Sequence, residues 1–394
     1  MQLYDFKEIE ERVILIGVQT EQDEDVAASL NELEELASTA GAVTVGKVIQ
    51  NREAVHPGTY IGKGKIEEVA ALLAAYDANG IICDDELSPA QMNNLERELD
   101  CKVMDRTLLI LDIFAGRATT SEGKIQVELA QLRYRSARLV GLRESLSRLG
   151  GGIGTRGPGE KKLETDRRLI RTRISALKAE LAQVEKHREL IRGKRSRGNL
   201  KTAAIVGYTN AGKSTLLNTL TGAGILAEDK LFATLDPTTR VLELKEGQQI
   251  LLTDTVGFIR KLPHHLVEAF KSTLEEAKYA DYIIHVVDVS NPQAELQMHT
   301  VYETLRELGA TGKKIITLLN KQDQADGAQI RDLQADYTVK CSARTGEGLE
   351  EFKDVLAKLL AESQTYLEEL YDYKEAGKLQ IIREYGSLIS EEYR

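Results

Sequence analysis

Residues 207–214 combine glycine, lysine and serine at a spacing that can hold phosphate groups. Backbone N–H groups of such a loop surround a β-phosphate, the lysine reaches β- and γ-phosphate oxygens, and the serine hydroxyl can ligate Mg²⁺. Glycine at two of the positions lets the backbone come close to the phosphates. The loop predicts binding of a nucleoside triphosphate, with Lys213 as a catalytic group. Its residues are Gly207, Tyr208, Thr209, Asn210, Ala211, Gly212, Lys213 and Ser214.

The segments on either side of this loop are those that a phosphate-binding loop requires. The apolar run 203–206 predicts a strand, and the run 215–220 predicts the first turns of a helix. The N-terminus of that helix adds partial positive charge next to the bound phosphates. Without this strand and helix the same residues would be an ordinary glycine-containing turn.

A second polar motif, at 320–323, predicts which base is bound. It follows an apolar strand at 314–319. The carboxylate of Asp323 can accept from the N1–H and 2-amino groups of guanine, and adenine offers neither donor. Asn320 and the stem of Lys321 would brace the loop and cover the base, and the run 341–344 would close the pocket with a backbone N–H. These residues, predicted to bind GTP, are Asn320, Lys321, Gln322, Asp323, Ser342, Ala343 and Arg344.

Two segments between these motifs are predicted to contact the γ-phosphate. At the end of an apolar strand at 249–253 stand Asp254, Thr255, Val256 and Gly257. Asp254 would hold Mg²⁺ through water, and the Gly257 N–H would donate to the γ-phosphate, which makes Gly257 a further catalytic group. Upstream, a polar loop at 232–240 precedes a strand at 241–244. Its predicted nucleotide contacts are Phe232, Ala233, Thr234, Leu235 and Asp236, and a second Mg²⁺ ligand could be Thr234, Thr238 or Thr239.

Two residues depart from the simplest GTPase pattern. Phe258 stands where many GTPases have a glutamine that orients the attacking water. Phenylalanine cannot hydrogen-bond water, so we expect slow hydrolysis by the protein alone and a need for a partner. Asn210 could help to hold a monovalent cation such as K⁺ beside the phosphates, or it could simply hydrogen-bond the loop backbone; the sequence leaves both open.

Length and composition predict a cytoplasmic protein of two or three domains. The chain has 394 residues, and no apolar run reaches the length of a membrane span. Its first residues do not form a signal peptide, and we expect a monomer. The three cysteines are scattered and odd in number, which favours reduced thiols over a disulfide framework or a metal site. The histidines form no ligand cluster, and His264–His265 is read as an exposed pair.

Positive charge is concentrated in one part of an acidic chain. Residues 133–197 carry 19 lysines and arginines against 7 acidic residues, a local charge of +12. The whole chain carries −10, so the remainder carries −22. Apolar residues recur at steps of three, four and seven within 121–148 and 160–195, which predicts a long antiparallel helical hairpin.

The turn of this hairpin is rich in glycine, with six in residues 150–159. A flexible linker and a solvated helix face are the simpler interpretations. However, glycine permits close backbone approach, and cations at such a tip can neutralise phosphates. Because few aromatic residues are nearby, the pattern favours recognition of RNA by shape and phosphates rather than by base stacking. The predicted RNA contacts are Arg148, Arg156, Lys161 and Lys162.

Three domains and a short tail follow along the chain, in an α/β fold. Strand-like and helical runs alternate in 1–117, which predicts an N-terminal parallel α/β domain. Its Gly62-Lys63-Gly64-Lys65 stretch could be a second phosphate site but is read as a glycine turn with exposed lysines. The basic helical hairpin would occupy 118–198, a phosphate-loop (P-loop) GTPase domain 199–362, and a short tail 363–394.

The chain resembles, over nearly its full length, the HflX family of translation-factor-like, ribosome-associated GTPases of the Obg-HflX group. The segments that carry the resemblance are residues 56–63 in approximate pattern, the glycine-rich tip continuing through 160–168, and the phosphate loop; the guanine motif and residues 232–236 are also similar. Within the polar loop, the resemblance favours Thr234 as the second Mg²⁺ ligand, and we expect Thr234 to be a catalytic group together with Lys213 and Gly257.

The resemblance implies a factor that docks on the large ribosomal subunit, with the hairpin reaching ribosomal RNA near the catalytic centre. The family is associated with splitting stalled ribosomes, and its GTP hydrolysis is stimulated by the ribosome. Functions that other members place in a longer C-terminal extension are in doubt here. The alternatives are a GTP-dependent ribosome assembly factor or RNA chaperone, and a GTPase that regulates a protein complex through a basic docking arm.

Overall fold

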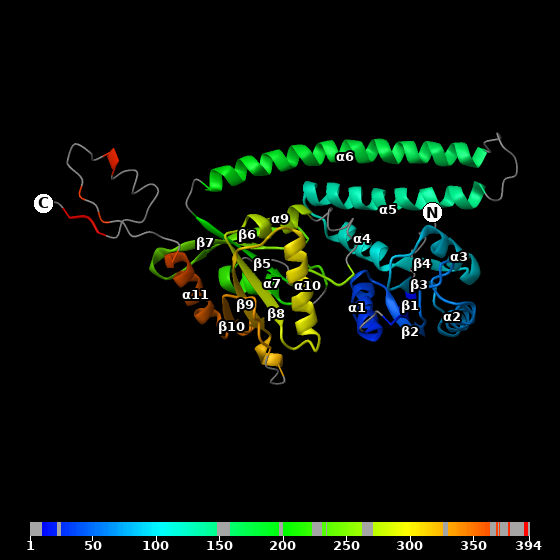
Figure 1. Ribbon diagram of the computed structural model, residues 1–394, viewed down its shortest axis with the longest axis horizontal. Helices are drawn as coiled ribbons and strands as arrows, with labels where there is room; N and C mark the ends of the chain where they lie inside the picture. Colours follow the sequence, from blue (N-terminus) through cyan, green and yellow to red (C-terminus); the bar gives the residue numbers. More distant parts are fainter. Residues whose placement is uncertain are drawn as a thin grey trace, which may run out of the picture. The chain divides into compact units, whose positions relative to one another are not determined.

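A computed structural model describes residues 10–21, 25–147, 158–196, 200–222, 231–233, 235–261, 271–325 and 330–362, with a few residues of the tail. The chain divides into two compact units, whose elements are labelled in Figure 1. The first unit contains Met1–Leu181, Glu228–Leu235 and Arg260–Lys271, and the second contains Ala182–Ala227, Asp236–Ile259 and Ser272–Arg394. Two short segments from the predicted GTPase domain therefore belong to the first unit.

A four-stranded parallel sheet forms the centre of the first unit, with strand order β2-β1-β3-β4. Its strands are β1 (Arg12–Gln19), β2 (Val43–Asn51), β3 (Gly80–Cys83) and β4 (Lys102–Asp105). Alternating with them are α1 (Val26–Thr39), α2 (Lys63–Tyr76), α3 (Pro89–Leu99) and α4 (Arg106–Arg117). The predicted parallel α/β domain is confirmed. The strand order reverses between β1 and β3, and at such points the carboxyl ends of the strands open onto a crevice.

Local sequence explains these elements. Residues 13–18 of β1 are buried, as expected for an inner strand of a parallel sheet covered on both faces. Asp25 begins α1 by accepting from the Ala28 N–H, and Asp105 begins α4 by accepting from the Leu108 N–H. Each carboxylate satisfies a backbone donor that has no partner inside its helix.

Two long helices, α5 (Ser121–Ser147) and α6 (Pro158–Ser196), form the predicted antiparallel hairpin, and Figure 1 shows them side by side. In the first unit, Arg173 of α6 forms a two-pronged ion pair with Glu128 of α5, at 2.7 and 2.8 Å. Leu177 is fully buried while most of its neighbours on α6 are exposed, and Leu129 of α5 is buried too. A narrow apolar seam therefore holds the helices together.

The second unit is built on a six-stranded sheet with the order β10-β9-β8-β5-β7-β6, antiparallel only between β6 and β7. Its strands are β5 (Lys201–Gly207), β6 (Thr238–Glu243), β7 (Gln249–Asp254), β8 (Tyr282–Asp288), β9 (Lys314–Asn320) and β10 (Tyr337–Lys340). The helices are α7 (Lys213–Thr221), α9 (Lys271–Tyr279), α10 (Ala294–Glu307) and α11 (Leu349–Glu362), with short 3₁₀ turns η1 (Lys245–Gly247) and η2 (Gln322–Gln324).

The core of this sheet supports the ends of β5, β7 and β9. Ile205, Leu252, Ile284 and Leu318 are among its fully buried residues, and they come from four adjacent strands. Leu216 of α7 packs into the same cluster. Since parallel strands end at one edge of the sheet, the segments that follow β5, β7 and β9 are held near one another.

Strand β6 begins earlier than the sequence predicts. Thr238, Thr239 and Arg240 were expected in a polar loop, but they pair with β7, with Thr238 opposite Asp254. The hydroxyl oxygens of Thr239 and Thr253 lie 3.0 Å apart across the two strands. The loop prediction for these three residues is therefore wrong, because cross-strand pairing outweighs their polar character. Thr239 is a weaker candidate for a metal ligand, since its hydroxyl already has a partner.

Cys83 and Cys341 are buried, Cys101 is half-buried, and all three are free thiols, as predicted. Among the described residues, no helix combines the length and the apolar character needed to cross a membrane. The predicted exposed pair His264–His265 lies outside the described residues.

Candidate nucleotide-binding site

The phosphate loop connects β5 to α7, as the sequence predicts. Gly212 has φ +94°, and a Cβ there would lie 2.4 Å from the Asn320 Nδ2. At Gly207 a Cβ would lie 2.3 Å from the Val286 carbonyl oxygen. Neither position has room for a Cβ, and the positive φ at Gly212 also favours glycine there. Asn210 also adopts a left-handed conformation, with φ +59°.

Lys213 begins α7 and is buried under the loop. Its Nζ donates to the carbonyl oxygens of Tyr208 at 2.7 Å and Gly207 at 3.2 Å. Burial lowers the pKa of Lys213 to about 8, and the carboxylate of Asp254 only partly opposes this shift. A buried ammonium with a lowered pKa favours an anionic ligand, because a phosphate would stabilise its charged form.

Ser214 and Asp254 supply oxygen atoms suited to a magnesium ion. The Ser214 hydroxyl donates to Asp254 Oδ2 at 2.7 Å, and Asp254 is fully buried at the end of β7. Mg²⁺ prefers oxygen ligands at about 2.1 Å in an octahedron, so neighbouring ligands lie about 3 Å apart. The hydroxyl could therefore ligate such an ion, and the neighbouring carboxylate could hold a water molecule bound to it. Among the described residues no group of three or more His, Cys, Asp or Glu could hold a metal by itself, so phosphate oxygens and water would complete the shell.

The segment after β7 lies directly along the phosphate loop. The Thr209 N–H donates to the Phe258 carbonyl oxygen at 2.8 Å, and the Phe258 N–H donates to the Gly207 carbonyl oxygen at 3.1 Å. The Thr255 hydroxyl donates to the Ile205 carbonyl oxygen at 2.8 Å. Val256 and the Phe258 side chain are buried. Residues 254–258 are thus fixed along the phosphate loop, and their predicted contact with a γ-phosphate stays a prediction.

Gly257 is in close contact with the phosphate loop. A Cβ at this position would lie 2.6 Å from the Thr209 Cα and 3.0 Å from the Lys213 Nζ. Only glycine fits this backbone approach. The predicted roles of Gly257 and Lys213 are consistent with this proximity, although no ligand contact tests them.

The carboxamide of Asn320 joins two loops of the predicted guanine pocket. Its Nδ2 donates to the Ala211 carbonyl oxygen at 2.8 Å, and its Oδ1 accepts from the Ala343 N–H at 2.8 Å. Lys321 has φ +64°, and its Nζ lies 2.8 Å from Asp288 Oδ2. Asp288, at the end of β8, was missed by the sequence reasoning. A carboxylate directly after the apolar run 282–287 was the available signal.

The remaining residues of the predicted guanine pocket lie in η2 and in the run at 341–344. Asp323 lies in η2 and is exposed, so its carboxylate can be reached by a base. Gln322 is half-buried, and its N–H donates to the Cys341 carbonyl oxygen at 3.3 Å. Ser342 is buried and Arg344 is exposed. The structure brings the motif at 320–323 and the run at 341–344 together, as the sequence predicts.

The polar loop before β6 is described only in part. Thr234, the favoured second Mg²⁺ ligand, lies outside the described residues. Phe232 has φ +55° and is buried, and its ring packs edge-on against Phe114 of α4 with centroids 4.6 Å apart. Phe232, Ala233 and Leu235 belong to the first unit, and Asp236 belongs to the second. Their predicted contacts with nucleotide stay predictions.

The structure describes only part of the predicted RNA contacts. Arg148 and Arg156 lie outside the described residues. Lys161 and Lys162 lie in the first turns of α6, and their side chains are outside the described set. Further along α6, exposed cations do occur: Arg168, Arg171, Arg173, Lys178 and Lys186.

Comparison with known proteins gives matches along most of the chain. Residues 27–115 match a family described as "GTP-binding GTPase N-terminal", residues 117–195 match "GTP-binding GTPase Middle Region", and residues 202–321 match "50S ribosome-binding GTPase".

Full-length relatives and a solved structure agree with these matches. A protein named GTPase HflX from Lacrimispora saccharolytica is 69% identical over 394 residues, covering 100% of this chain and 93% of its own. GTPase HflX of Escherichia coli K12 is 43% identical over 363 residues, covering 91% and 85%. A crystal structure described as SsGBP in complex with GDP is 27% identical, with a TM-score of 0.50, covering 89% of this chain and 99% of that one.

Proposed function

Because the chain belongs to the HflX family of GTPases, we propose that it binds the large ribosomal subunit and acts in ribosome splitting, rescue or recycling. Its own reaction is the hydrolysis of GTP to GDP and phosphate. Support for the ribosomal partner comes from the match of residues 202–321 to a family described as ribosome-binding GTPases. The basic hairpin supports the same partner, because it offers cations for RNA phosphates.

In the proposed site, the chain itself supplies charge neutralisation and orientation. Lys213 neutralises β- and γ-phosphate oxygens, and N–H groups of the loop and of Gly257 donate to them. Ser214 would hold Mg²⁺ directly and Asp254 would hold it through water, with Thr234 as the proposed second direct protein ligand. When bound, Mg²⁺ neutralises charge on the β- and γ-phosphates. Asp323 would select guanine, while Asn320 and Lys321 fix the pocket around it.

One observation carries the proposal that a partner controls hydrolysis. Phe258 occupies the position after Gly257, its side chain is buried, and both its backbone groups are bonded to the phosphate loop. It has no side-chain group that could orient water. An attacking water must therefore be ordered by another part of the chain or by a partner, and we propose that the large ribosomal subunit provides this ordering.

Sedimentation of ribosomes tests the proposal. Intact ribosomes are incubated with the protein and GTP, GDP or a non-hydrolysable GTP analogue, and phosphate release is measured in parallel. We expect co-sedimentation with the large subunit, faster phosphate release with ribosomes, and separation of intact ribosomes into subunits. Binding to the large subunit without separation would favour the assembly-factor alternative. Equal phosphate release with and without ribosomes would contradict ribosomal stimulation.

Variants of the hairpin tip test the RNA contact. Neutralising Arg148, Arg156, Lys161 and Lys162 should weaken ribosome binding and flatten its salt dependence, because fewer counterions are released from RNA. GTP affinity should change little. A matched control neutralises four exposed cations of the second unit: Lys245, Lys278, Arg306 and Lys314. Equal loss in both variants would mean that only net charge matters, and an unchanged tip variant would show the hairpin to be a solvated coil.

A further inference from the structure

A buried carboxylate stands in the loop that begins with the predicted guanine motif. This loop, residues 321–336, connects β9 to β10 in the second unit. The side chain of Asp332 is only 2% exposed. Its Oδ2 accepts from the Tyr302 and Thr317 hydroxyls, each at 2.6 Å, and its Oδ1 accepts from the Gln334 N–H at 3.0 Å. One side chain thus ties the loop to α10 and to β9.

The charge of Asp332 depends on these donors. Burial alone would raise the pKa of Asp332, but the donors around the carboxylate hold that pKa well below its usual value. The Nδ1 of His285 lies 3.7 Å from Asp332 Oδ2, which is too far for a hydrogen bond. Burial also lowers the pKa of His285, so its ring is neutral at pH 7 and adds no full positive charge. Since a buried charge is costly unless it is hydrogen-bonded, each hydroxyl bond to Asp332 matters.

The elements that supply the donors also support the nucleotide site. Thr317 is fully buried in β9, three residues before Asn320. Tyr302 lies on α10, which packs against β8 (Figure 1), and its ring meets the His285 ring edge-on with centroids 5.1 Å apart. In the pairing of β8 with β9, His285 stands opposite Thr317 and Asp288 stands opposite Asn320. Asp332 is therefore bonded to the strand that ends in the guanine motif and to the helix beside it.

Apolar contacts fix the same loop at two further points. Ala325 comes two positions after Asp323, and Ile330 comes two positions before Asp332; residues 326–329 between them lie outside the described set. Both Ala325 and Ile330 pack against one buried cluster, which consists of Val287, Val289, Ala294, Met298 and Leu319. The loop therefore rests on a common apolar surface both close to Asp323 and close to Asp332.

The turn η2 that carries Asp323 has little packing of its own. None of the residues Gln322–Gln324 is buried. Gln322 bonds the Cys341 carbonyl oxygen at 3.3 Å through its N–H and the Leu319 carbonyl oxygen at 3.2 Å through Nε2. Both bonds are longer than the usual value of about 2.9–3.0 Å. The bonds to Asp332 are shorter and have a charged acceptor, which makes them stronger. The position of Asp323 therefore depends on how firmly the rest of the loop is held.

We propose that Asp332 is a positioning residue for guanine recognition, because its bonds to Tyr302 and Thr317 hold the loop in the arrangement in which Asp323 meets the base. This inference rests on the proposed role of Asp323. Asp332 acts through the loop, since its own carboxylate faces α10 and β9. A loosened loop presents Asp323 correctly for only part of the time, and the affinity for guanine falls by that fraction. Binding of the phosphates does not use this loop.

Titrations with GDP and ADP test the proposal in the full-length protein. The two nucleotides share the ribose and both phosphates, and adenine offers Asp323 neither of the donors that guanine has. Displacement of fluorescent GDP gives both Kd values. We expect Asp332→Ala to raise the Kd for GDP about tenfold or more and the Kd for ADP less than about twofold, because only GDP needs the aligned carboxylate. General damage to the domain would weaken both nucleotides alike.

Milder variants keep the test decisive if Asp332→Ala does not fold. Tyr302→Phe and Thr317→Val each remove one hydroxyl with little change of shape, and each should weaken GDP about three- to tenfold while ADP binding stays the same. Asp332→Asn should lie between wild type and Asp332→Ala. Its amide oxygen can still accept from both hydroxyls, but its NH₂ group would face the Gln334 N–H. Thermal unfolding scans establish that each variant is folded at the temperature of the titration.

A matched control lies at the opposite edge of the same sheet. Asp281 directly precedes β8, and its Oδ2 accepts from the Thr202 N–H at 2.9 Å and from the Thr202 hydroxyl at 3.0 Å. Asp281→Asn should leave the affinities for GDP and ADP at their wild-type values.

Two results would overturn the proposal. One is an equal loss of GDP and ADP affinity in the Asp332 variants, which would mean that Asp332 only stabilises the domain. The other is unchanged GDP affinity in folded Tyr302→Phe and Thr317→Val. A wild-type protein that binds GDP no better than ADP would instead overturn the proposed guanine site.

Discussion

Replacing Asn320 with alanine would remove the carboxamide that joins two loops of the nucleotide site. The Ala211 carbonyl oxygen and the Ala343 N–H would each lose a buried partner at 2.8 Å. A buried polar group left unsatisfied costs about 1–3 kcal/mol. Asn320→Ala should therefore lose about 2–6 kcal/mol, shared between the free energy of unfolding and the free energy of nucleotide binding.

The share that falls on binding can be measured directly. If half of the loss appears in nucleotide binding, the Kd for GDP should rise roughly 5- to 150-fold. Titration with fluorescent GDP gives this number, and a thermal unfolding scan of the ligand-free protein gives the rest.

A matched control is available in Asn79. Its carboxamide also makes two hydrogen bonds, accepting from the Arg12 N–H at 3.0 Å and donating to the Glu10 carbonyl oxygen at 3.1 Å, but both are exposed. Asn79→Ala should cost less than about 1 kcal/mol of unfolding free energy and leave GDP affinity unchanged. If Asn320→Ala and Asn79→Ala had equal effects on both measurements, the bracing role of Asn320 would be refuted.

Three further predictions concern base choice, protons and cations. Asp323→Asn should weaken GTP binding and favour the xanthine nucleotide, and titration with labelled GTP and XTP checks this; an unchanged preference would contradict the guanine assignment. Bound phosphate should raise the lowered pKa of Lys213, so GDP binding takes up a proton above about pH 8, and affinity measured from pH 7 to 9.5 should fall there. In the ligand-free protein, the pH dependence of stability has the opposite sign. Between pH 8 and 10.5 the unfolded chain binds more protons at Lys213 than the folded chain does, so the contribution of Lys213 to the free energy of unfolding rises with pH. If Asn210 holds a monovalent cation, GTP hydrolysis should be faster in K⁺ than in Na⁺ at equal ionic strength, and Asn210→Ala should abolish the difference.

Local patterns predicted the elements of the fold because their information lies within short stretches of chain. The alternation of apolar strands with helical runs over 1–117 predicted the parallel sheet, since β1 and β3 read as buried runs. The apolar steps within 160–195 predicted the helical hairpin, and Leu177, which stands at one of these steps, is buried. Strand β6 was placed less well, because threonine and arginine at 238–240 look polar and gain their order only from pairing with β7.

The chemistry of the nucleotide site was equally local. The phosphate loop, the motif at 320–323 and Phe258 after Gly257 are each readable within a few residues, because the loop backbone and its side chains act as one unit. The sequence by itself therefore determined the class of ligand and the residues expected to hold it. The sequence also predicted that the cations of the hairpin are exposed, because the apolar residues occupy one face of α6 and leave the cations on the other faces.

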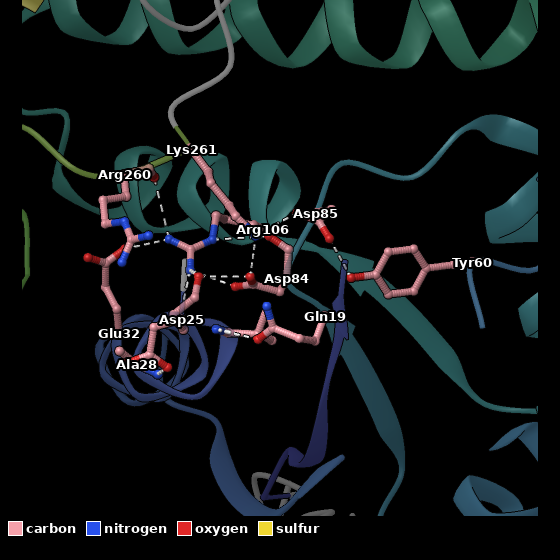
Figure 2. A network of polar contacts seen from close by, with 12 residues as sticks. Gln19, Asp25, Ala28, Glu32, Tyr60, Asp84, Asp85, Arg106, Arg260 and Lys261 are labelled. Carbon is pink, nitrogen blue, oxygen red and sulfur yellow. Dashed lines mark hydrogen bonds and ion pairs between the residues drawn. The ribbon is translucent and has the colours of Figure 1, made fainter. Parts of the chain in front are cut away.

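Only the tertiary structure decided how these parts are connected. Asn320 bonds Ala211, 109 positions away, and Lys261 pairs with Asp84 across 177 positions. The spacing of residues along the sequence does not predict such pairs. They depend on which strands end at the same edge of a sheet and on which loop packs against those strand ends. Lys261 and Asp84 taken singly are ordinary charged residues. Burial of Asp84 beside Arg106 and the return of the chain at Lys261 are what bring these charges into one ion-pair cluster (Figure 2).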